Sequence, residues 1–120
     1  MITEDYVSFV VAKLLKEKGF DVDCRMSYFN GLLVDYTMYG FCDGELISCP
    51  TLQMASKWLR MVHKIDLCVF PCYYDYCLHG YECKIYKNKE LLCSLTGFKV
   101  YEEAMDTALL FVLNKDNNII

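Results

Sequence analysis

The stretch CVFPCYYDYCLHGYEC, at residues 68–83, gathers side chains that can bind a metal or attack a substrate. It contains four cysteines and one histidine, namely Cys68, Cys72, Cys77, Cys83 and His79. Zinc is usually held by pairs of the C-x2–4-C and H-x3–5-H kind. Three residues separate Cys68 from Cys72, and four separate Cys72 from Cys77, so a zinc site is one hypothesis for this stretch.

The same cysteines also fit strands, and this is the interpretation we favour. Cys68 and Cys83 fall within segments in which apolar and polar residues alternate, and no C-x2-C pair is present. A free cysteine behaves as a small hydrophobic side chain and is often buried. An even number of cysteines, here eight, would suggest disulfides in a secreted protein, but the acidic start of the chain is not typical of a secretory signal. We therefore expect reduced thiols and no metal, in a cytoplasmic protein.

A catalytic cysteine is the second hypothesis, and it has little support. A nucleophilic cysteine needs a base within reach and a group that orients the base. Asp75 and His79 are four residues apart, with Cys72 and Cys77 near them, but only proximity in the sequence connects these side chains. The other histidine, His63, is expected at a helix end, where a cation suits the helix dipole. We expect no enzymatic activity, no catalytic residue and no cofactor.

The tyrosines of the same stretch are more informative. Tyr73, Tyr74 and Tyr76 crowd a segment that we expect to be a loop over residues 71–80, which is too short to bury all three rings. Exposed aromatic rings with a polar tip are typical of protein-binding surfaces. The alternative is that two of the three rings cover the edge of a sheet, and the sequence leaves both possibilities open.

A basic stripe is predicted on the second helix. Lys57, Arg60 and Lys64 are spaced at i, i+3 and i+7, which places them on one face of an α-helix. Such a stripe is usually a solvated surface, but it can also bind an anion or nucleic acid. The three cations therefore join the three tyrosines as candidate binding residues.

The distribution of charge limits the classes of partner. The net charge of the chain is −4, while residues 49–99 carry seven basic and four acidic side chains, a local charge of +3. Because nucleic-acid affinity comes mostly from cations that meet phosphates, strong binding of nucleic acid is not expected. No apolar run approaches the ~20 residues that span a bilayer, so no membrane partner is expected.

The N-terminal part of the chain predicts a helix and a hairpin. Residues 4–18 carry apolar side chains at helical spacing, with Thr3 as the N-cap and Gly19 just past the end. Asn30 and Gly31 separate two apolar runs, and this pair favours the positive φ angles of a tight hairpin turn.

The remainder predicts an antiparallel sheet between two helices, since its central segments alternate with period two. The second helix begins near Pro50, with Thr51 able to cap it. The expected elements are a glycine-rich loop at 39–48, a helix at 50–64, strands at 65–70, 81–86 and 91–97, and a helix at 101–114. We predict a single α+β domain over residues 1–120, in which an N-terminal helix and β-hairpin precede an α-β-β-β-α unit with helices packed on its sheet.

From residue 50 onward, the order of helix, three strands and helix is that of the double-stranded RNA-binding domain. That domain needs lysines at the start of its last helix. This chain has Glu102, Glu103 and Asp106 there instead. The likeness therefore supports the topology and not the function.

The segments PTLQMASKWLRMVHKI at 50–65 and GFKVYEEAMDTALLFVL at 97–113 resemble a family of small proteins from phages and prophages of Bacteroides-type gut bacteria. The opening YVSFVVAKLLKEKGFD resembles the same family, so the likeness covers most of the chain. In that family a Thr or Ser usually caps the last helix, whereas Val100 stands at that position here. The resemblance implies an accessory protein that acts inside a bacterium, often by binding and blocking host or defence components, and it brings no catalytic residue.

These observations predict a non-catalytic phage or prophage accessory protein in the cytoplasm of a bacterial host. We expect it to bind a host or phage macromolecule, with inhibition of a host defence component as one form of that activity. A protein partner is expected, and the high apolar content also favours a homodimer or larger homo-oligomer. One alternative is a sponge that binds a small anionic signal through Lys57, Arg60 and Lys64, and a second is a weak nucleic-acid-binding module.

Overall fold

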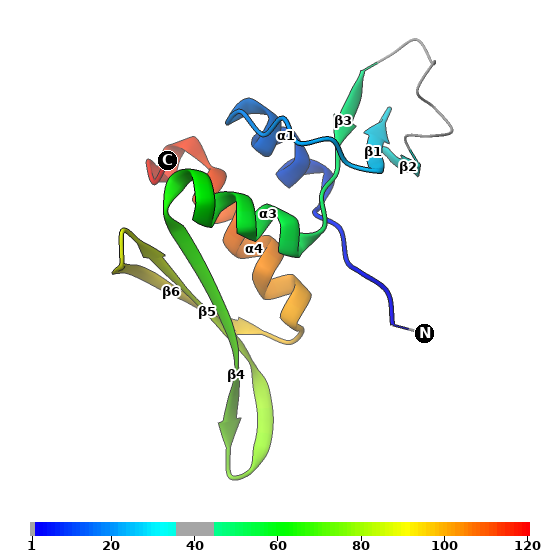
Figure 1. Cartoon of the computed structure of the whole chain (residues 1–120). Helices are drawn as coiled ribbons and strands as arrows, with labels where there is room; N and C mark the ends of the chain where they lie inside the picture. Colours follow the sequence, from blue (N-terminus) through cyan, green and yellow to red (C-terminus); the bar gives the residue numbers. More distant parts are fainter. Residues whose placement is uncertain (1, 36–44) are drawn as a thin grey trace.

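The structure is a computed structural model that describes residues 2–35 and 45–120 (Figure 1). Its helices are α1 (Phe9–Glu17), α3 (Leu52–Trp58), the π-helical turn η1 (Leu59–His63), α4 (Tyr101–Leu113) and the 3₁₀ turn η2 (Lys115–Asn117). Its strands are β1 (Met26–Phe29), β2 (Leu32–Asp35), β3 (Leu46–Ser48), β4 (Ile65–Tyr74), β5 (Cys77–Lys87) and β6 (Glu90–Phe98). The strands form two antiparallel sheets, in the orders β2-β1-β3 and β4-β5-β6, so the predicted α+β class is confirmed.

The larger sheet has one face covered by α4, which contacts all three of its strands, while α1 and α3 pack against α4 in turn. Alternate residues of the sheet point into this layer, and Ile65, Cys83 and Ile85 are fully buried in one core cluster with Leu109 and Leu113 of α4. Burying an apolar side chain of this size contributes about 1.5–3 kcal/mol. This core therefore holds the larger sheet in a defined position against α4, and the candidate sites lie at the ends of that sheet.

The predicted hairpin at Asn30-Gly31 is confirmed. Phe29 pairs with Leu32, which leaves Asn30 and Gly31 as the two turn residues, with φ angles of 51° and 80°. Positive φ at both central residues is the requirement of a type I′ turn. The strand β3 was not predicted, because it falls within the stretch at 39–48 that was expected to be a loop. The rest of that loop, together with Cys42, lies outside the described residues, apart from Glu45.

The first helix is shorter than predicted. It begins at Phe9 with Ser8 as its N-cap, so the assignment of Thr3 as N-cap was wrong. The preceding segment is extended and forms a bridge between Tyr6 and Thr51. The helix end is as predicted, because the N–H groups of Gly19 and Phe20 close a Schellman motif on Lys16 and Leu15.

Asp106 of α4 is hydrogen-bonded to the backbone at Ser8, the N-cap of α1. Its carboxylate accepts a hydrogen bond of 2.9 Å from the backbone N–H of Ser8. A helix begins with N–H groups that have no partner within the helix. The last helix therefore anchors the first one through a polar contact that the sequence pattern does not reveal.

The second helix keeps its predicted cap but not its predicted face. Thr51 accepts a hydrogen bond from the N–H of Met54, as expected. The helix then widens into the π turn η1, which adds a residue to the turn and rotates the positions after it around the helix axis. Val62, which has the helical spacing of the apolar residues Leu52, Ala55 and Leu59, is consequently 56% exposed. The basic stripe that assumed a regular α-helix is altered by the same turn.

The three strands of the larger sheet are confirmed, but two of them are longer than predicted. Residues 71–80, expected to be a loop, continue β4 and β5 up to a two-residue turn at Asp75 and Tyr76. In β6, Leu91 has the alternating spacing of the half-buried residues Cys93 and Leu95, but it is 53% exposed. The register shifts between Ile85 and Tyr86, so the alternation in β6 is broken there.

Within the described part of the chain, none of the helices has the length and apolar character needed to span a membrane.

Candidate functional site

A two-stranded ribbon projects from the larger sheet. The third strand, β6, pairs with β5 no further than Tyr81, which lies opposite Phe98. Beyond that point, within the described part of the chain, β4 and β5 pair only with each other, through Cys72↔Gly80 and Tyr74↔Cys77. Figure 1 shows this ribbon extending away from the helices, at the bottom of the view. We call residues 71–80 the aromatic ribbon, because the aromatic segment of the sequence forms its tip.

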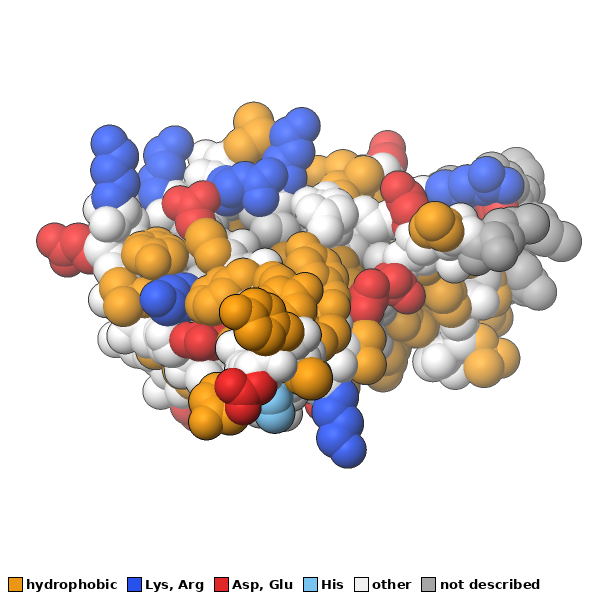
Figure 2. All heavy atoms as spheres, turned by 90° about the horizontal axis from the view of Figure 1, so that it is seen from below, with side chains coloured by type: hydrophobic (Ala, Val, Ile, Leu, Met, Phe, Trp, Pro, Cys, Tyr) orange, Lys and Arg blue, Asp and Glu red, His pale blue; other side chains and the backbone are white. Residues whose placement is uncertain are grey.

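The three candidate tyrosines all lie on the aromatic ribbon with their rings in solvent. Tyr73 is 67% exposed, Tyr74 is 69% exposed and Tyr76 is 103% exposed. The ring of Tyr74 packs edge-on against His79 with 5.6 Å between the ring centroids, and Leu78 beside it is 49% exposed. Figure 2 views the molecule from this end and shows a continuous apolar patch at the centre of the face, next to a histidine. The structure thus leaves all three rings available for contact.

The turn of the aromatic ribbon departs from the usual chemistry of such turns. Asp75 and Tyr76 have φ angles of 50° and 62°. A type I′ turn commonly uses Asn or Asp first and glycine second. A non-glycine residue in this left-handed region is less stable by roughly 1–3 kcal/mol. Because the ring of Tyr76 is fully exposed, no packing against the described residues compensates for this conformation.

Gly80 lets the aromatic ribbon join the three-stranded sheet. Its φ angle is 141°, and a Cβ atom there would lie 2.4 Å from the carbonyl oxygen of Phe98. Only glycine permits so close an approach of the β6 backbone. Pro71 lies opposite Tyr81 in β4, an edge strand, where the missing N–H of proline is tolerated. Pro71 and Gly80, at the two ends of the segment that was expected to be a loop, therefore mark the base of the ribbon.

The cysteines of the ribbon region are divided between the two faces of the sheet. Cys83 is fully buried with Ile85, as predicted, and burial raises the pKa of its thiol to about 11. Cys72 lies on the opposite face with its Sγ atom 3.7 Å from Glu82 Oε2, and desolvation followed by the Glu82 charge raises its pKa. Cys68 and Cys77 are exposed. Since the thiolate is both the nucleophile and the metal ligand, raised pKa values oppose both roles for Cys72 and Cys83.

The structure assembles no zinc-type cluster from these side chains. Among residues 2–35 and 45–120, no group of three His, Cys, Asp or Glu side chains is arranged to hold a metal ion. The seven described cysteines are free thiols, with Cys42 outside the described residues. Cys83 is therefore a packing residue of the core. The exposed thiols of Cys68 and Cys77 belong to no group of metal-ligating side chains among the described residues.

The basic candidates are partly brought together. Arg60 and Lys64 line a hollow of about 280 Å³ between the end of η1 and the turn that joins β5 to β6. That turn contributes Asn88 and Lys89, and Asp66 completes the lining. Lys57 is exposed on α3 and does not line the hollow. The π turn explains the difference, because it ends the regular spacing on which the predicted stripe depended.

Lys89 is the member of this cluster that the sequence patterns did not single out. In the sequence, Lys89 belongs to the segment KNKE at 87–90, between two of the predicted strands. The feature that could have identified Lys89 is the pair Asn88-Lys89, because glycine is preferred after Asn in a two-residue hairpin turn and lysine stands there instead.

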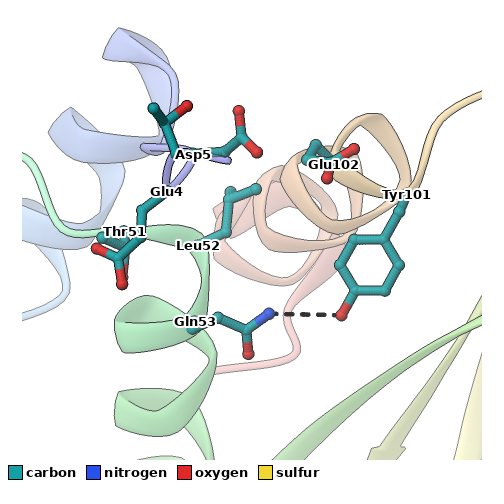
Figure 3. A pocket seen from close by; sticks show the side chains of 8 residues that line it. Glu4, Asp5, Thr51, Leu52, Gln53, Tyr101 and Glu102 are labelled. Carbon is teal, nitrogen blue, oxygen red and sulfur yellow. Dashed lines mark hydrogen bonds between the residues drawn. The ribbon is translucent and has the colours of Figure 1, made fainter. Parts of the chain in front are cut away.

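A second hollow, of about 180 Å³, lies where the N-terminal segment meets the starts of α3 and α4 (Figure 3). Glu4, Asp5 and Glu102 line it, and the Gln53 side-chain amide donates a 3.5 Å hydrogen bond to the Tyr101 hydroxyl at its edge. Helix N-termini favour nearby carboxylates. The three acids are therefore explained by stabilisation of the N-termini of α3 and α4, beside which they lie.

His63 is enclosed beside Trp58, with their ring centroids 4.8 Å apart. Its Nε2 atom is buried without a hydrogen-bond partner among the described residues. Burial lowers the pKa of His63, and the charges of Lys87 and Lys18 lower it further. The imidazole faces cations and an indole ring, which is not the environment of a general base paired with a nucleophile.

Scans of protein-family models, of curated proteins and of solved structures each found no match to this chain.

Proposed function

We propose that this chain is a non-catalytic protein-binding module that contacts its partner through the aromatic ribbon. The observation that carries the proposal is Tyr76, a fully exposed ring at a backbone position where glycine would be more stable. Neither packing nor turn geometry accounts for tyrosine there. Contact with another molecule does account for it, because strain is commonly retained at functional positions.

The dimensions of the ribbon suit a protein partner. Three largely exposed tyrosines offer roughly 400–600 Å² of surface. One side of a standard protein interface buries about 800 Å². Because Tyr73 and Tyr74 are consecutive residues of β4 and point to opposite faces of the ribbon, a partner that encloses both faces of the tip would cover most of this area. Tyrosine is also a residue that frequently dominates binding energy.

The chemistry of the ribbon indicates how the partner would be recognised. Strand addition along β4 is disfavoured, because Pro71 has no N–H to donate to an added strand. Recognition would then rest on side chains, with the ring of Tyr76 inserted into an apolar cleft of the partner and the Asp75 carboxylate kept at its polar rim, because burying an unpaired charge is costly. The tyrosine rings supply the apolar contact, and their hydroxyl groups can form hydrogen bonds at the rim.

The biological setting is part of the proposal. The resemblance to phage and prophage proteins supports a module that acts in a bacterial host and blocks a host or defence component. A homodimer also belongs to the proposal, since Leu91 and Leu92 are exposed on the edge strand β6. Two such edges could pair and cover these side chains, which is a recognised route of self-association.

A crosslinking experiment tests the proposed function. Tyr76 is replaced by the photo-crosslinking residue p-benzoylphenylalanine, and Lys89 is replaced in the same way as a control at the equivalent position of another hairpin. We expect a defined protein to crosslink from position 76 and not from position 89. That protein, prepared in pure form, should bind the unmodified chain in a titration.

The variants Tyr76→Gly and Lys89→Gly then complete the test. Each removes a side chain from the second position of a type I′ turn, so the backbone effect is matched. Tyr76→Gly should weaken binding at least tenfold, about 1.4 kcal/mol, while Lys89→Gly should bind as the parent does. Equal binding by all three proteins would refute the role of the ribbon.

A further inference from the structure

The hollow between η1 and the β5–β6 turn has a fixed geometry. The backbone N–H of Asn88 donates a 3.0 Å hydrogen bond to the carbonyl oxygen of Lys64, which joins the two segments that carry its lysines. The guanidinium group of Arg60 donates a 3.2 Å hydrogen bond to Oγ of Ser56, a buried residue of the preceding turn. These two hydrogen bonds restrict the backbone that carries the lysines and the side chain of Arg60, which lowers the conformational entropy lost when a ligand binds.

The charge of the hollow is unbalanced. Arg60, Lys64 and Lys89 are positive and Asp66 is negative, so these lining residues carry a net charge of +2. None of the three cations forms an ion pair with any residue that the structure describes. This surplus lies in a chain whose net charge is −4. A ligand with two negative charges would balance the site.

The backbone gives an independent argument. Lys64 has φ 58° and ψ 36°, directly after η1, a position at which glycine commonly ends a helix. Lys89 has φ 72° at the second position of its turn, where glycine is again preferred. The Lys64 Nζ atom donates a 3.4 Å hydrogen bond to the carbonyl oxygen of Met61 at the end of η1, so this side chain is held beside the hollow. Lys89 occupies a left-handed position at which its side chain brings no conformational advantage. Such conflicts between local preference and residue type are expected at functional sites.

We propose that Arg60, Lys64 and Lys89 bind a phosphomonoester group of a small molecule in this hollow. A phosphomonoester carries about −1.5 to −2 charges near pH 7, which matches the surplus. Arginine can form paired hydrogen bonds to phosphate oxygens, and lysine adds compact positive charge. Among the described residues that line the hollow, none is aromatic, which indicates recognition of the anion rather than of an attached base. This site lies at the opposite end of the sheet from the aromatic ribbon (Figure 1), so it is independent of the proposed protein contact.

The test is an NMR titration of the intact chain at constant ionic strength, with glycerol 2-phosphate as the probe. Dimethyl phosphate is the matched control, because it is a diester with a single negative charge. We expect saturable shifts of the amide signals of Lys64 and Asn88 with the monoester. Affinity for the diester should be at least tenfold weaker.

Four variants locate the site. Lys64→Gly and Lys89→Gly should each weaken binding at least tenfold while keeping the melting temperature equal or higher. Lys57→Ala and Tyr76→Gly should bind the monoester as the parent does. Lys89→Asn serves as a second variant at its position, since it removes the charge and keeps a residue that tolerates the turn.

Three results would overturn the proposal. One is binding of the diester as tight as that of the monoester, which would assign the cations to backbone phosphates of nucleic acid. Another is an equal loss of affinity in Lys57→Ala, which would indicate general charge attraction. The third is unchanged binding in both Lys64→Gly and Lys89→Asn.

Discussion

Three residues in equivalent positions, Gly31, Tyr76 and Lys89, differ in what they contribute. Each is the second residue of a two-residue hairpin turn with positive φ. Gly31 follows the conformational preference of such a turn. Tyr76 and Lys89 do not, and each places its side chain at the end of the sheet where a binding surface is proposed. The comparison of these three turns therefore distinguishes Gly31, which stabilises its turn, from Tyr76 and Lys89, which do not.

His63 provides a prediction on pH dependence at the same scale. Its pKa in the folded state lies below the usual 6.5, because burial and nearby lysines disfavour the imidazolium. The unfolded chain therefore binds more protons near this pH, and folding is favoured above it. The free energy of unfolding should fall as the pH is lowered from ~7.5 to ~5.5, and His63→Gln should reduce this fall.

Urea denaturation at several pH values measures the effect. The matched control is His79→Gln, which makes the same substitution at the histidine on the exposed aromatic ribbon. An unaltered pH dependence in His63→Gln would contradict the assignment.

At the scale of elements, the junction of β5 with β6 depends on Gly80. An added methyl group would lie 2.4 Å from a backbone carbonyl oxygen, which cannot move without displacing β6. We expect Gly80→Ala to lower the free energy of unfolding by about 2–4 kcal/mol. Gly97→Ala is the control, because its φ is 88° but no described atom lies within 4 Å of the added carbon. Chemical denaturation should show a loss near ~1 kcal/mol for the control, and equal losses would argue against the close contact.

The link between the first and last helices gives a second prediction for the elements. Removing the Asp106 carboxylate leaves the N–H of Ser8 without its partner at the start of α1. Asp106→Ala should lower stability by about 1–3 kcal/mol. Glu103→Ala, on the exposed side of the same helix, should change stability by less than about 0.5 kcal/mol. Similar thermal denaturation curves for the two variants would show that the link contributes nothing.

Sequence patterns predicted the elements whose signals are local. The alternation around Ile65 and Ile85, the Asn30-Gly31 pair and the Gly19 helix end all depend on neighbouring residues, and each is confirmed. Exposure of Val62 was not predictable from a period of 3.6, since a π turn changes that period.

The missed features depend on tertiary contacts. The anchoring of Ser8 by Asp106 spans most of the chain, and the continuation of β4 past Pro71 depends on pairing with β5. For the candidate sites, the tyrosines were identified from crowding alone, whereas the hollow required the meeting of η1 with a distant turn. Lys57 was assigned to that cluster because a regular helix was assumed.

At the scale of the whole molecule, the two candidate surfaces lie at opposite ends of one sheet. Ile65 pairs with Lys87 at the end near the basic hollow, and Tyr74 pairs with Cys77 at the end of the aromatic ribbon. A strand of ten residues spans roughly 30 Å. One sheet can thus present a protein contact at one end and an anion site at the other without direct interference.

Self-association is tested at this scale. If β6 edges pair as proposed, light scattering at micromolar concentration should give the mass of at least two chains of 14.0 kDa each. Leu92→Lys should shift the mass to one chain, since an edge lysine opposes strand pairing. Lys13→Ala, on the exposed face of α1, serves as the control and should keep the parental mass. A single-chain mass for the parent protein would contradict the proposed homodimer.

The most direct measurement of the central claim compares stability and partner affinity in Tyr76→Gly. If tyrosine is retained at this turn for binding, the variant should be more stable than the parent by about 1 kcal/mol. Its affinity for the protein crosslinked at position 76 should nevertheless fall at least tenfold. A variant that is less stable than the parent, or one that binds the partner unchanged, would contradict the account of the aromatic ribbon as the binding surface.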